Sequence, residues 1–327
     1  MEAVNKTADQ SDDAPAPLSP VARSLTPWLS AALALIGIFW ASGVAVDIGL
    51  ALITEQVICG VLGLTFAIIY LNVPLRRKVQ TTLAWYDAVA AFLGFAVGWY
   101  LFFRYPTLLD KIAYMPKEAS TVGFITILLT AEALRRTAGW GLLFVLFAFS
   151  AYGFFGHLVP GTLSGRSMDL GIFFSYLGID TNALLGTPLI IIFTVVVVFI
   201  FLGQVLLRSG GSEFFTDFAA ALMGRSRGGS AKIAVVASGL FGSISGSAVS
   251  NVASTGVITI PLMRQGGYTS RVAGAIEAVA STGGQIMPPI MGAAAFLMAE
   301  LADVLYQEVI VAAILPALLY YISVFLQ

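Results

Sequence analysis

Most of the chain consists of long apolar runs separated by short polar stretches. Runs lie at about 28–46, 55–74, 83–103, 121–134, 139–159, 187–207 and 309–326. A helix that crosses a bilayer needs ~20 apolar residues, so most of these lengths predict membrane-spanning helices, with 121–134 a shorter one. The run at 187–207 is rich in β-branched residues, which favour strands in water, but its length and hydropathy predict a helix.

One apolar stretch, from residue 231 to residue 264, has a polar centre. Lys232 and Arg264 lie near its ends, and Gly, Ser and Asn gather between residues 242 and 256. Each arm is too short to span the bilayer comfortably. If basic flanks mark the cytoplasmic side, both ends lie there, and the stretch is a re-entrant hairpin. Irregular backbone at membrane depth is tolerated only where it is buried in protein or lines a cavity.

A second interruption divides the apolar run from Tyr268 to about Ala302. Its sequence, from residue 281 to residue 289, is STGGQIMPP. Pro288 has no backbone N–H and disfavours the helical conformation at Met287. Gly283 and Gly284 add backbone freedom. The pattern predicts a discontinuous helix.

Composition supports the same class of protein. The chain is 58% hydrophobic and 11% charged, whereas about a quarter of the residues are charged in soluble domains. The mean hydropathy is +0.90. We therefore predict an all-α polytopic membrane protein, a helical bundle with a re-entrant helical hairpin and a discontinuous helix. The net charge of −1 argues against nucleic-acid binding.

The polar stretches predict four parts. Residues 1–25 are a disordered cytoplasmic tail without the features of a signal peptide, and 26–160 form an N-terminal membrane domain. Residues 161–186 form an external connector, and 187–327 a second membrane domain. Basic residues at 76–78 and 135–136 follow the second and fourth runs, which places those ends and the N-terminus in the cytoplasm.

The two interruptions hold the candidate chemistry. Unwound backbone frees carbonyl oxygens, and broken helices direct their partial charges at the gap, an arrangement suited to a small hard cation such as Na⁺. The candidate Na⁺ ligands are Ser243, Ser245, Ser247, Asn251 and the backbone carbonyls of Gly284, Met287 and Pro288. Candidates for substrate contact or transport are Ser250, Thr255, Glu277, Ser281, Thr282 and Gln285. The alternative is that the small residues only allow helices to approach closely.

Three acidic residues within the apolar runs have separate interpretations. Glu277 precedes the second interruption by about one helical turn, and an ionisable group at membrane depth is a functional candidate. A structural pairing with Arg271 is the alternative, as is a hydrogen-bonded helix end. Glu132 has the spacing for ion pairs with the arginines at 135–136. Asp87, at the start of its span, is interpreted as a residue of the membrane interface.

Signatures of enzymes are weak. The segment GSISG at 242–246 has Ile244 at its centre, so it fails the G-x-S-x-G pattern of a nucleophile elbow. A phosphate-binding loop is absent from the sequence, which gives no sign that the chain uses ATP itself. His157 is the only histidine and Cys59 the only cysteine, which argues against metal centres, catalytic triads and an internal disulfide. We expect no enzyme activity.

Three segments together resemble the fused membrane subunit of TRAP (tripartite ATP-independent periplasmic) transporters, of the type that works with TAXI-class substrate-binding proteins. They are FFTDFAAALMGRSRGG at 214–229, GLFGSISGSAVSNVASTG at 239–256 and GAIEAVASTGGQIMPPIMGAAAF at 274–296. The resemblance covers about 185–327 strongly. It covers 28–160 more loosely, in the manner of the small subunit fused ahead of the large one.

The resemblance implies a Na⁺-driven secondary importer in a bacterial inner membrane, with Na⁺ as coupling ion. A periplasmic binding protein of the TAXI type would deliver a small organic acid. Residues 187–327 would form the first part of an elevator-type transport domain, and 231–264 its first hairpin. The family's first Na⁺ site would use hairpin serines and the carbonyls of Gly284, Met287 and Pro288. The family's second hairpin should lie beyond Gln327, so the chain resembles the N-terminal portion of a longer protein.

Other functions stay open at this point. The chain can be the permease of an ATPase-driven importer, with a helix from Ser212 to Arg225 as the coupling helix, or a channel-like pore. It can also be an inactive, truncated fragment that serves as a scaffold. An intramembrane hydrolase is a more distant alternative. Uptake that requires Na⁺ but not ATP separates the first of these from a secondary importer.

Overall fold

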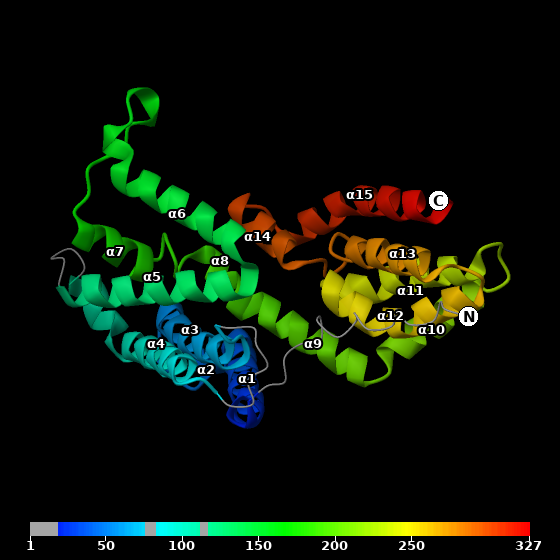
Figure 1. The fold of residues 1–327 in the computed structure, drawn as a ribbon, viewed down its shortest axis with the longest axis horizontal. Helices are drawn as coiled ribbons and strands as arrows, with labels where there is room; N and C mark the ends of the chain where they lie inside the picture. The colour runs from blue at the N-terminus through cyan, green and yellow to red at the C-terminus, as the bar shows by residue number, and fades with distance from the viewer. Residues whose placement is uncertain (1–18, 76–82, 112–116) are drawn as a thin grey trace, which may run out of the picture. The chain divides into compact units, whose positions relative to one another are not determined.

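The computed structural model describes residues 19–75, 83–111 and 117–327, and every regular element in them is a helix (Figure 1). Within this part of the chain, the helices long and apolar enough to cross a membrane are Pro20–Ala41, Thr54–Asn72, Trp85–Lys111, Trp140–Leu158, Thr187–Arg208 and Tyr306–Leu326. The prediction of an all-α polytopic membrane protein is therefore confirmed. The predicted tail up to residue 18 and the basic cluster at 76–78 lie outside the described residues.

The chain divides into two compact units. Unit 1 comprises residues 1–36 and 46–186, and unit 2 comprises residues 37–45 and 187–327. Unit 1 contains the first part of α1 (Pro20–Ala41), with α2 (Val44–Asp47) at its boundary. Its further helices are α3 (Thr54–Asn72), α4 (Trp85–Lys111), α5 (Lys117–Ala138), α6 (Trp140–Phe155) and α7 (Leu170–Ile179).

Helix α1 begins earlier than the tail boundary at residue 25 that composition predicts. Pro20 is its first residue, a position where the missing N–H of proline costs nothing. The hydroxyl of Ser19 accepts a hydrogen bond from the amide of Ala22 at 3.2 Å, as an N-cap does. The Ser-Pro pair therefore starts a helix inside a stretch whose composition indicates disorder.

The expected external connector includes a packed helix. Helix α7 lies against α5, where Gly178 meets Gly123 so closely that a Cβ at Gly178 would lie 2.5 Å from the Gly123 Cα. Beside this contact, the rings of Phe124 and Phe174 meet edge to face at 4.9 Å. The segment therefore packs within unit 1. Helix α5 contains the predicted 121–134 span, but its charged residues keep it out of the set of membrane-crossing helices.

Asp87 has a partner that the sequence interpretation did not include. Its side chain is 1% exposed and accepts a hydrogen bond from Arg136 at 2.7 Å, so it is a buried ion-pair partner. Arg136 also bonds Glu132 at 2.8 Å and lies 4.7 Å from the centre of the Tyr70 ring. The predicted pairs of Glu132 with the arginines at 135–136 are confirmed. This network joins α3, α4 and α5.

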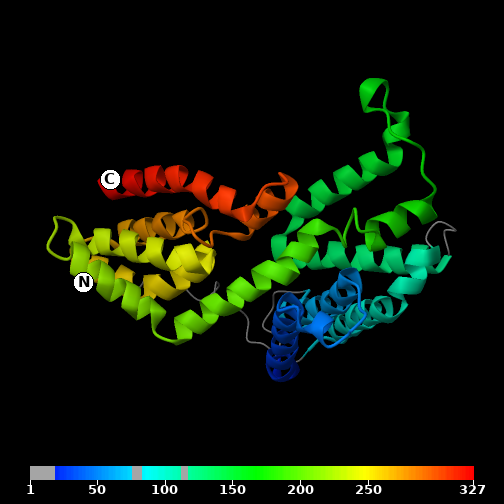
Figure 2. The same cartoon turned by 180° about the vertical axis from the view of Figure 1, so that it is seen from behind.

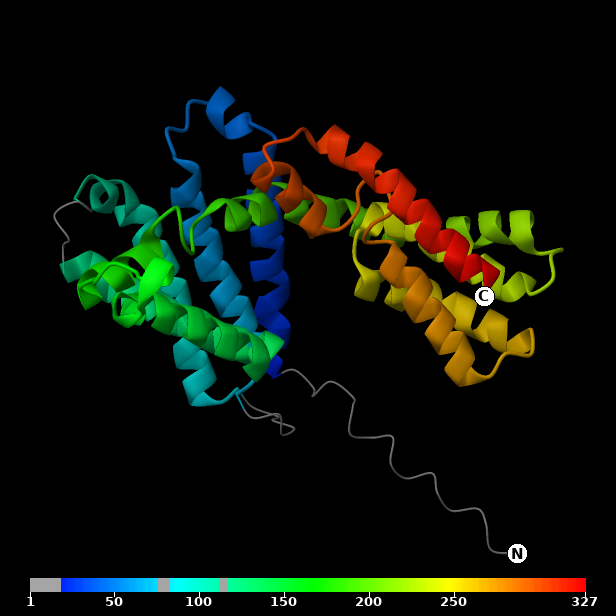
Figure 3. The same ribbon diagram turned by 90° about the horizontal axis from the view of Figure 1, so that it is seen from above.

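Unit 2 begins with α8 (Thr187–Ile191), a π-helical turn (Ile192–Val196) and α9 (Val197–Arg208). It continues with α10 (Gly211–Met223), α11 (Gly229–Ser245), α12 (Ala248–Gln265), α13 (Ser270–Gly283), α14 (Ala293–Leu301) and α15 (Tyr306–Leu326). Figures 1 and 2 show α11, α12 and α13 side by side. Small buried residues, Ala234 and Ala273, pack around Met263 where these three helices meet. A short loop joins α14 to α15, and the two helices are in contact (Figure 3).

Candidate functional site

The predicted hairpin is present as α11 and α12, and its irregular tip is shorter than the sequence indicates. Only Gly246 and Ser247 are non-helical, whereas the pattern predicts an irregular stretch from 242 to 256. Gly246 has φ 60° and ψ 3°, a left-handed conformation that glycine adopts at no steric cost. The hydroxyl of Ser247 caps α12 by accepting a hydrogen bond from the Ser250 amide at 3.3 Å. Two residues therefore reverse the chain.

The predicted discontinuous helix is also present. Helix α13 ends at Gly283 and α14 begins at Ala293. Between them, the amide of Gly292 donates to the carbonyl of Gln285 at 2.7 Å and closes the intervening loop. Pro288 and Pro289 occupy the middle of this loop. Their lack of N–H groups is compatible with backbone that is not hydrogen-bonded as a helix.

The two breaks lie against each other. The amide of Ile290 donates to the carbonyl of Ser243 at 3.1 Å. A Cβ on Gly242 would lie 2.5 Å from the Gly284 Cα, and a Cβ on Gly246 would lie 2.0 Å from the Met291 carbonyl oxygen. Backbone meets backbone at both points, because glycine leaves no side chain in the way.

This junction combines opposite helix ends. Helices α11 and α13 end there with C-termini, which carry partial negative charge, and α12 and α14 begin there with N-termini, which carry partial positive charge. The hydroxyl oxygen of Ser245, the last residue of α11, is buried without a hydrogen-bond partner in the described chain.

A second polar cluster lies in the same bundle, around the carboxyl group of Glu277 on α13. Glu277 is fully buried. Its Oε1 accepts from Ser238 at 2.9 Å, Thr255 at 2.5 Å and Ser281 at 3.1 Å, and its Oε2 accepts from Thr259 at 2.5 Å. We call this set of five residues the Glu277 cluster. It joins α11, α12 and α13 through side chains alone.

Comparison with known proteins places this arrangement in a family. Residues 125–327 match the model of the family described as "Tripartite ATP-independent periplasmic transporter, DctM component". The chain belongs to this family. The match takes in both breaks and the Glu277 cluster. The family is a transporter permease and not an enzyme.

Individual relatives agree with this assignment over shorter stretches. The chain is 33% identical over 121 residues to the C4-dicarboxylate TRAP transporter large permease protein DctM of Pseudomonas aeruginosa. The aligned stretch covers 37% of this chain and 28% of that protein. It is 30% identical over 122 residues to the sialic acid TRAP transporter permease protein SiaT of Haemophilus influenzae, 37% of this chain and 20% of SiaT. It is also 30% identical over 122 residues to the 2,3-diketo-L-gulonate TRAP transporter large permease protein YiaN of Escherichia coli, 37% of this chain and 26% of YiaN. The matched part is thus well under a third of each relative's length. No solved structure matches the chain significantly.

The predicted ligands of this TRAP permease chain divide into two groups. At the junction, Gly284 packs on Gly242, and the Ser243 hydroxyl bonds the Leu240 carbonyl of its own helix at 2.8 Å. Asn251 lies beside the junction, but its amide donates to the Ser238 carbonyl at 2.7 Å, which directs it towards the Glu277 cluster. Thr255, Glu277 and Ser281, predicted as transport residues, are all members of that cluster.

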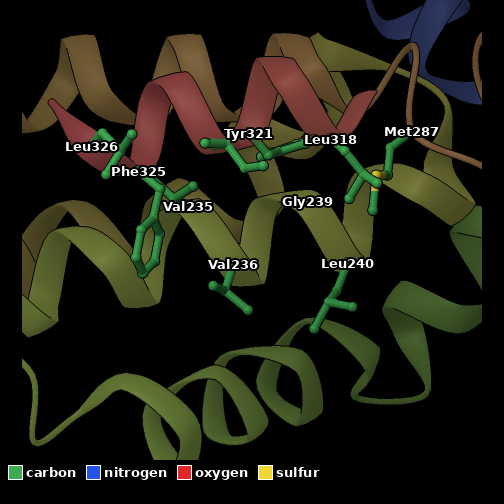
Figure 4. Close-up of a pocket in the computed structure, with 10 residues that line it drawn as sticks. Val235, Val236, Gly239, Leu240, Met287, Leu318, Tyr321, Phe325 and Leu326 are labelled. Atoms are coloured by element: carbon green, nitrogen blue, oxygen red, sulfur yellow. The ribbon is translucent and has the colours of Figure 1, made fainter. Parts of the chain in front are cut away.

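Two other predicted side chains, those of Thr282 and Gln285, lie outside both groups, whereas the prediction for Met287 concerns its backbone carbonyl and not its side chain. The Thr282 hydroxyl is exposed and bonds the Ala278 carbonyl of its own helix, and Gln285 is exposed too. The Met287 side chain lines an apolar pocket of about 290 Å³ between α11 and α15 (Figure 4). Its neighbours there include Gly239 and Tyr321. The structure therefore does not gather all the predicted residues into one site.

Sequence reasoning missed Ser238 and Thr259. A signal for Thr259 exists in the sequence, because Asn251, Thr255 and Thr259 recur every four residues and so share one face of a helix. Ser238 gives no such signal, since it is one small polar residue in the apolar arm of the hairpin. Only the packing of α11 on α13 brings its hydroxyl to Glu277.

Proposed function

We propose that this chain is the permease part of a Na⁺-coupled secondary importer that takes up a small organic acid delivered by a periplasmic binding protein. Its location would be the bacterial inner membrane, with the N-terminus in the cytoplasm. The binding protein would be of the TAXI type. Membership of a transporter permease family and six apolar helices support the membrane role. The names of the relatives mention sialic acid, a gulonate and a C4-dicarboxylate, which supports an acidic substrate.

The observation that carries the proposal is the direct contact of the two helix breaks, where the Ile290 amide donates to the Ser243 carbonyl at 3.1 Å. Two helix C-termini end beside it, and discontinuous membrane helices supply carbonyl oxygens and C-terminal partial charge to Na⁺ in secondary transporters. The N-termini of α12 and α14 offer N–H groups suited to a substrate carboxylate. One junction can thus serve a cation and an anion.

The test measures uptake of labelled organic acids into proteoliposomes that contain the complete transporter and its binding protein. We expect uptake with an inward Na⁺ gradient and without ATP, and loss of uptake when K⁺ or choline replaces Na⁺. Uptake that persists without Na⁺, or that requires ATP, would refute Na⁺ coupling.

A matched pair of variants tests the site itself. Ser245→Ala removes the unpartnered hydroxyl, so we expect about a tenfold loss of apparent Na⁺ affinity, equivalent to one charge-assisted contact of ~1.4 kcal/mol. Ser254→Ala is the control, because that hydroxyl bonds the Ser250 carbonyl of its own helix at 2.6 Å. Equal Na⁺ affinities in the two variants would remove Ser245 from the site.

A further inference from the structure

The Glu277 carboxyl group is buried with hydroxyl groups but without a positive charge. Ion pairs of the described residues all lie in unit 1, so none of them includes Glu277. Lys232 and Arg271 lie in the first turns of α11 and α13, and Arg264 lies in the last turn of α12, so all three are near helix ends away from the cluster. The titratable group that α15 places beside this part of α13 is the phenol of Tyr321, which donates a hydrogen bond to the Ala280 carbonyl at 3.0 Å.

An ionised carboxylate in such a place is costly. Removing one charge from water without a partner costs several kcal/mol in a protein interior. Four hydroxyl groups reduce this cost by donating hydrogen bonds, but they supply no net charge. Protonation of Glu277 removes the buried charge, provided that the added hydrogen finds an acceptor.

The geometry supplies that acceptor. The Thr259 hydroxyl oxygen lies 2.5 Å from Glu277 Oε2 and 2.9 Å from the Thr255 carbonyl oxygen. When Glu277 is ionised, Thr259 donates its single hydrogen to Oε2. When Glu277 is protonated, Oε2 donates to Thr259, which then donates to the Thr255 carbonyl. The hydrogen bonds are therefore complete in both protonation states, with no side-chain movement.

The hydrogen bonds of the other carboxyl oxygen, Oε1, can also be complete in both protonation states. The Thr255 hydroxyl lies 2.5 Å from Oε1 and 2.9 Å from the Asn251 carbonyl oxygen, so it can donate to either. Ser238 and Ser281 also reach Oε1, at 2.9 Å and 3.1 Å, and both can donate to it in either state.

These distances suit a proton better than a metal ion. Oxygen pairs at 2.5–2.9 Å are normal for O–H···O hydrogen bonds. A metal ion between two oxygens needs its own contact with each, which pushes the oxygens apart.

The cluster is connected to the junction of the breaks. Asn251 donates to the Ser238 carbonyl at 2.7 Å, and its amide nitrogen would lie 2.8 Å from a Cβ on Gly242, the residue that packs on Gly284. A change at Glu277 therefore reaches Gly242 through three contacts, by way of Ser238 and Asn251, and Gly284 through a fourth.

We propose that Glu277 is a proton-binding site of the hairpin bundle, which takes up and releases a proton through the Thr259 and Thr255 hydroxyls while α11, α12 and α13 stay joined. The proton comes from water and returns to water, so no other reactant is needed. Because the cluster contacts the junction, its protonation changes the affinity of the junction for its cation. This last consequence rests on the proposed function, whereas the proton site does not.

Infrared difference spectroscopy on the purified full chain in lipid nanodiscs tests the proton site directly. The pH is stepped between about 4 and about 9, the range over which glutamates titrate in proteins. We expect a C=O band of a protonated carboxylic acid that titrates in the wild type and is lost in Glu277→Gln. The control Glu300→Gln, which changes an exposed residue of α14, should keep that band. A band that persists in Glu277→Gln, or the absence of any such band in the wild type, would overturn the proposal.

A second measurement guards against misfolding. Glutamine has the shape and the hydrogen-bonding pattern of the protonated acid, so Glu277→Gln should melt within a few degrees of the wild type. Glu277→Leu leaves the four hydroxyls without their acceptor and should melt clearly lower. A Gln variant as unstable as the Leu variant would show that the cluster needs the charge, and would count against a protonated state.

Uptake assays then separate the two proposals. In the wild type, we expect the apparent Na⁺ affinity to change by about fivefold or more over the pH range, as for a typical coupling between sites. Glu277→Gln should remove this dependence. If the infrared band titrates as expected but uptake needs no Na⁺, the proton site stands and Na⁺ coupling fails. If uptake needs Na⁺ but the band is missing, Na⁺ coupling stands and the proton site fails.

Discussion

Gly246→Ala is the sharpest test of the contact between the two breaks. The added methyl group would lie 2.0 Å from the Met291 carbonyl oxygen and 3.0 Å from its carbon, and both atoms belong to the backbone. The left-handed conformation at φ 60° costs an L-residue about 1–2 kcal/mol. Overpacking typically adds about 1–3 kcal/mol. The variant should therefore lose about 2–5 kcal/mol, because the breaks must separate to admit the methyl group.

Thermal unfolding of the purified protein, with and without Na⁺, measures this loss. At about 2–4 °C per kcal/mol, the Tm should fall by about 4–20 °C. The stabilisation by Na⁺ should also shrink, because the junction is held open. Gly274→Ala is the matched control, since no atom lies within 4 Å of its added Cβ on α13. That variant should be unchanged or more stable by at most about 1 kcal/mol. A Gly246→Ala protein with the Tm of the control would refute the close contact between Gly246 and Met291.

Two further predictions concern buried polar groups. Arg136→Leu leaves Asp87 buried without its partner, so chemical unfolding should show a loss of about 3–5 kcal/mol. Arg104→Leu, in an exposed pair with Glu118, should cost much less, because water screens that pair. Equal losses would contradict the burial of the Asp87 pair. Asn251→Leu removes the hydrogen bond to the Ser238 carbonyl and should cost about 1–3 kcal/mol, with reduced Na⁺-dependent uptake but normal membrane insertion. Unchanged uptake would exclude Asn251 from transport.

The sequence located both breaks but not their extents. Gly, Pro and Ser inside apolar runs indicate interrupted helices, and the structure has interruptions in both places. The stretch from 248 to 256 is nevertheless helical, although its polar residues suggest a loop. Its hydroxyl groups bond carbonyls of their own helix: Ser254 bonds the Ser250 carbonyl, and Thr255 can bond that of Asn251. A side chain that is hydrogen-bonded in this way does not disrupt a helix. The polar residues therefore predicted a longer irregular tip than the structure has.

Asp87 shows a different limit. Its place at the start of a span beside Trp85 is typical of an interface residue, but its partner Arg136 lies 49 residues further along the chain. The pattern of residues around Asp87 contains no information about a contact with a residue so far along the chain.

The amino-acid order alone fixed the membrane class, the hairpin and the broken helix of this protein, because hydropathy and backbone freedom are properties of neighbouring residues. Tertiary structure alone decided that the two breaks touch and that Glu277 is surrounded by hydroxyls. Ser238 and Thr259 stand 39 and 18 residues from Glu277, on other helices. Which faces of three packed helices meet depends on how their small residues interlock, and that choice is made by the whole bundle rather than by any one segment.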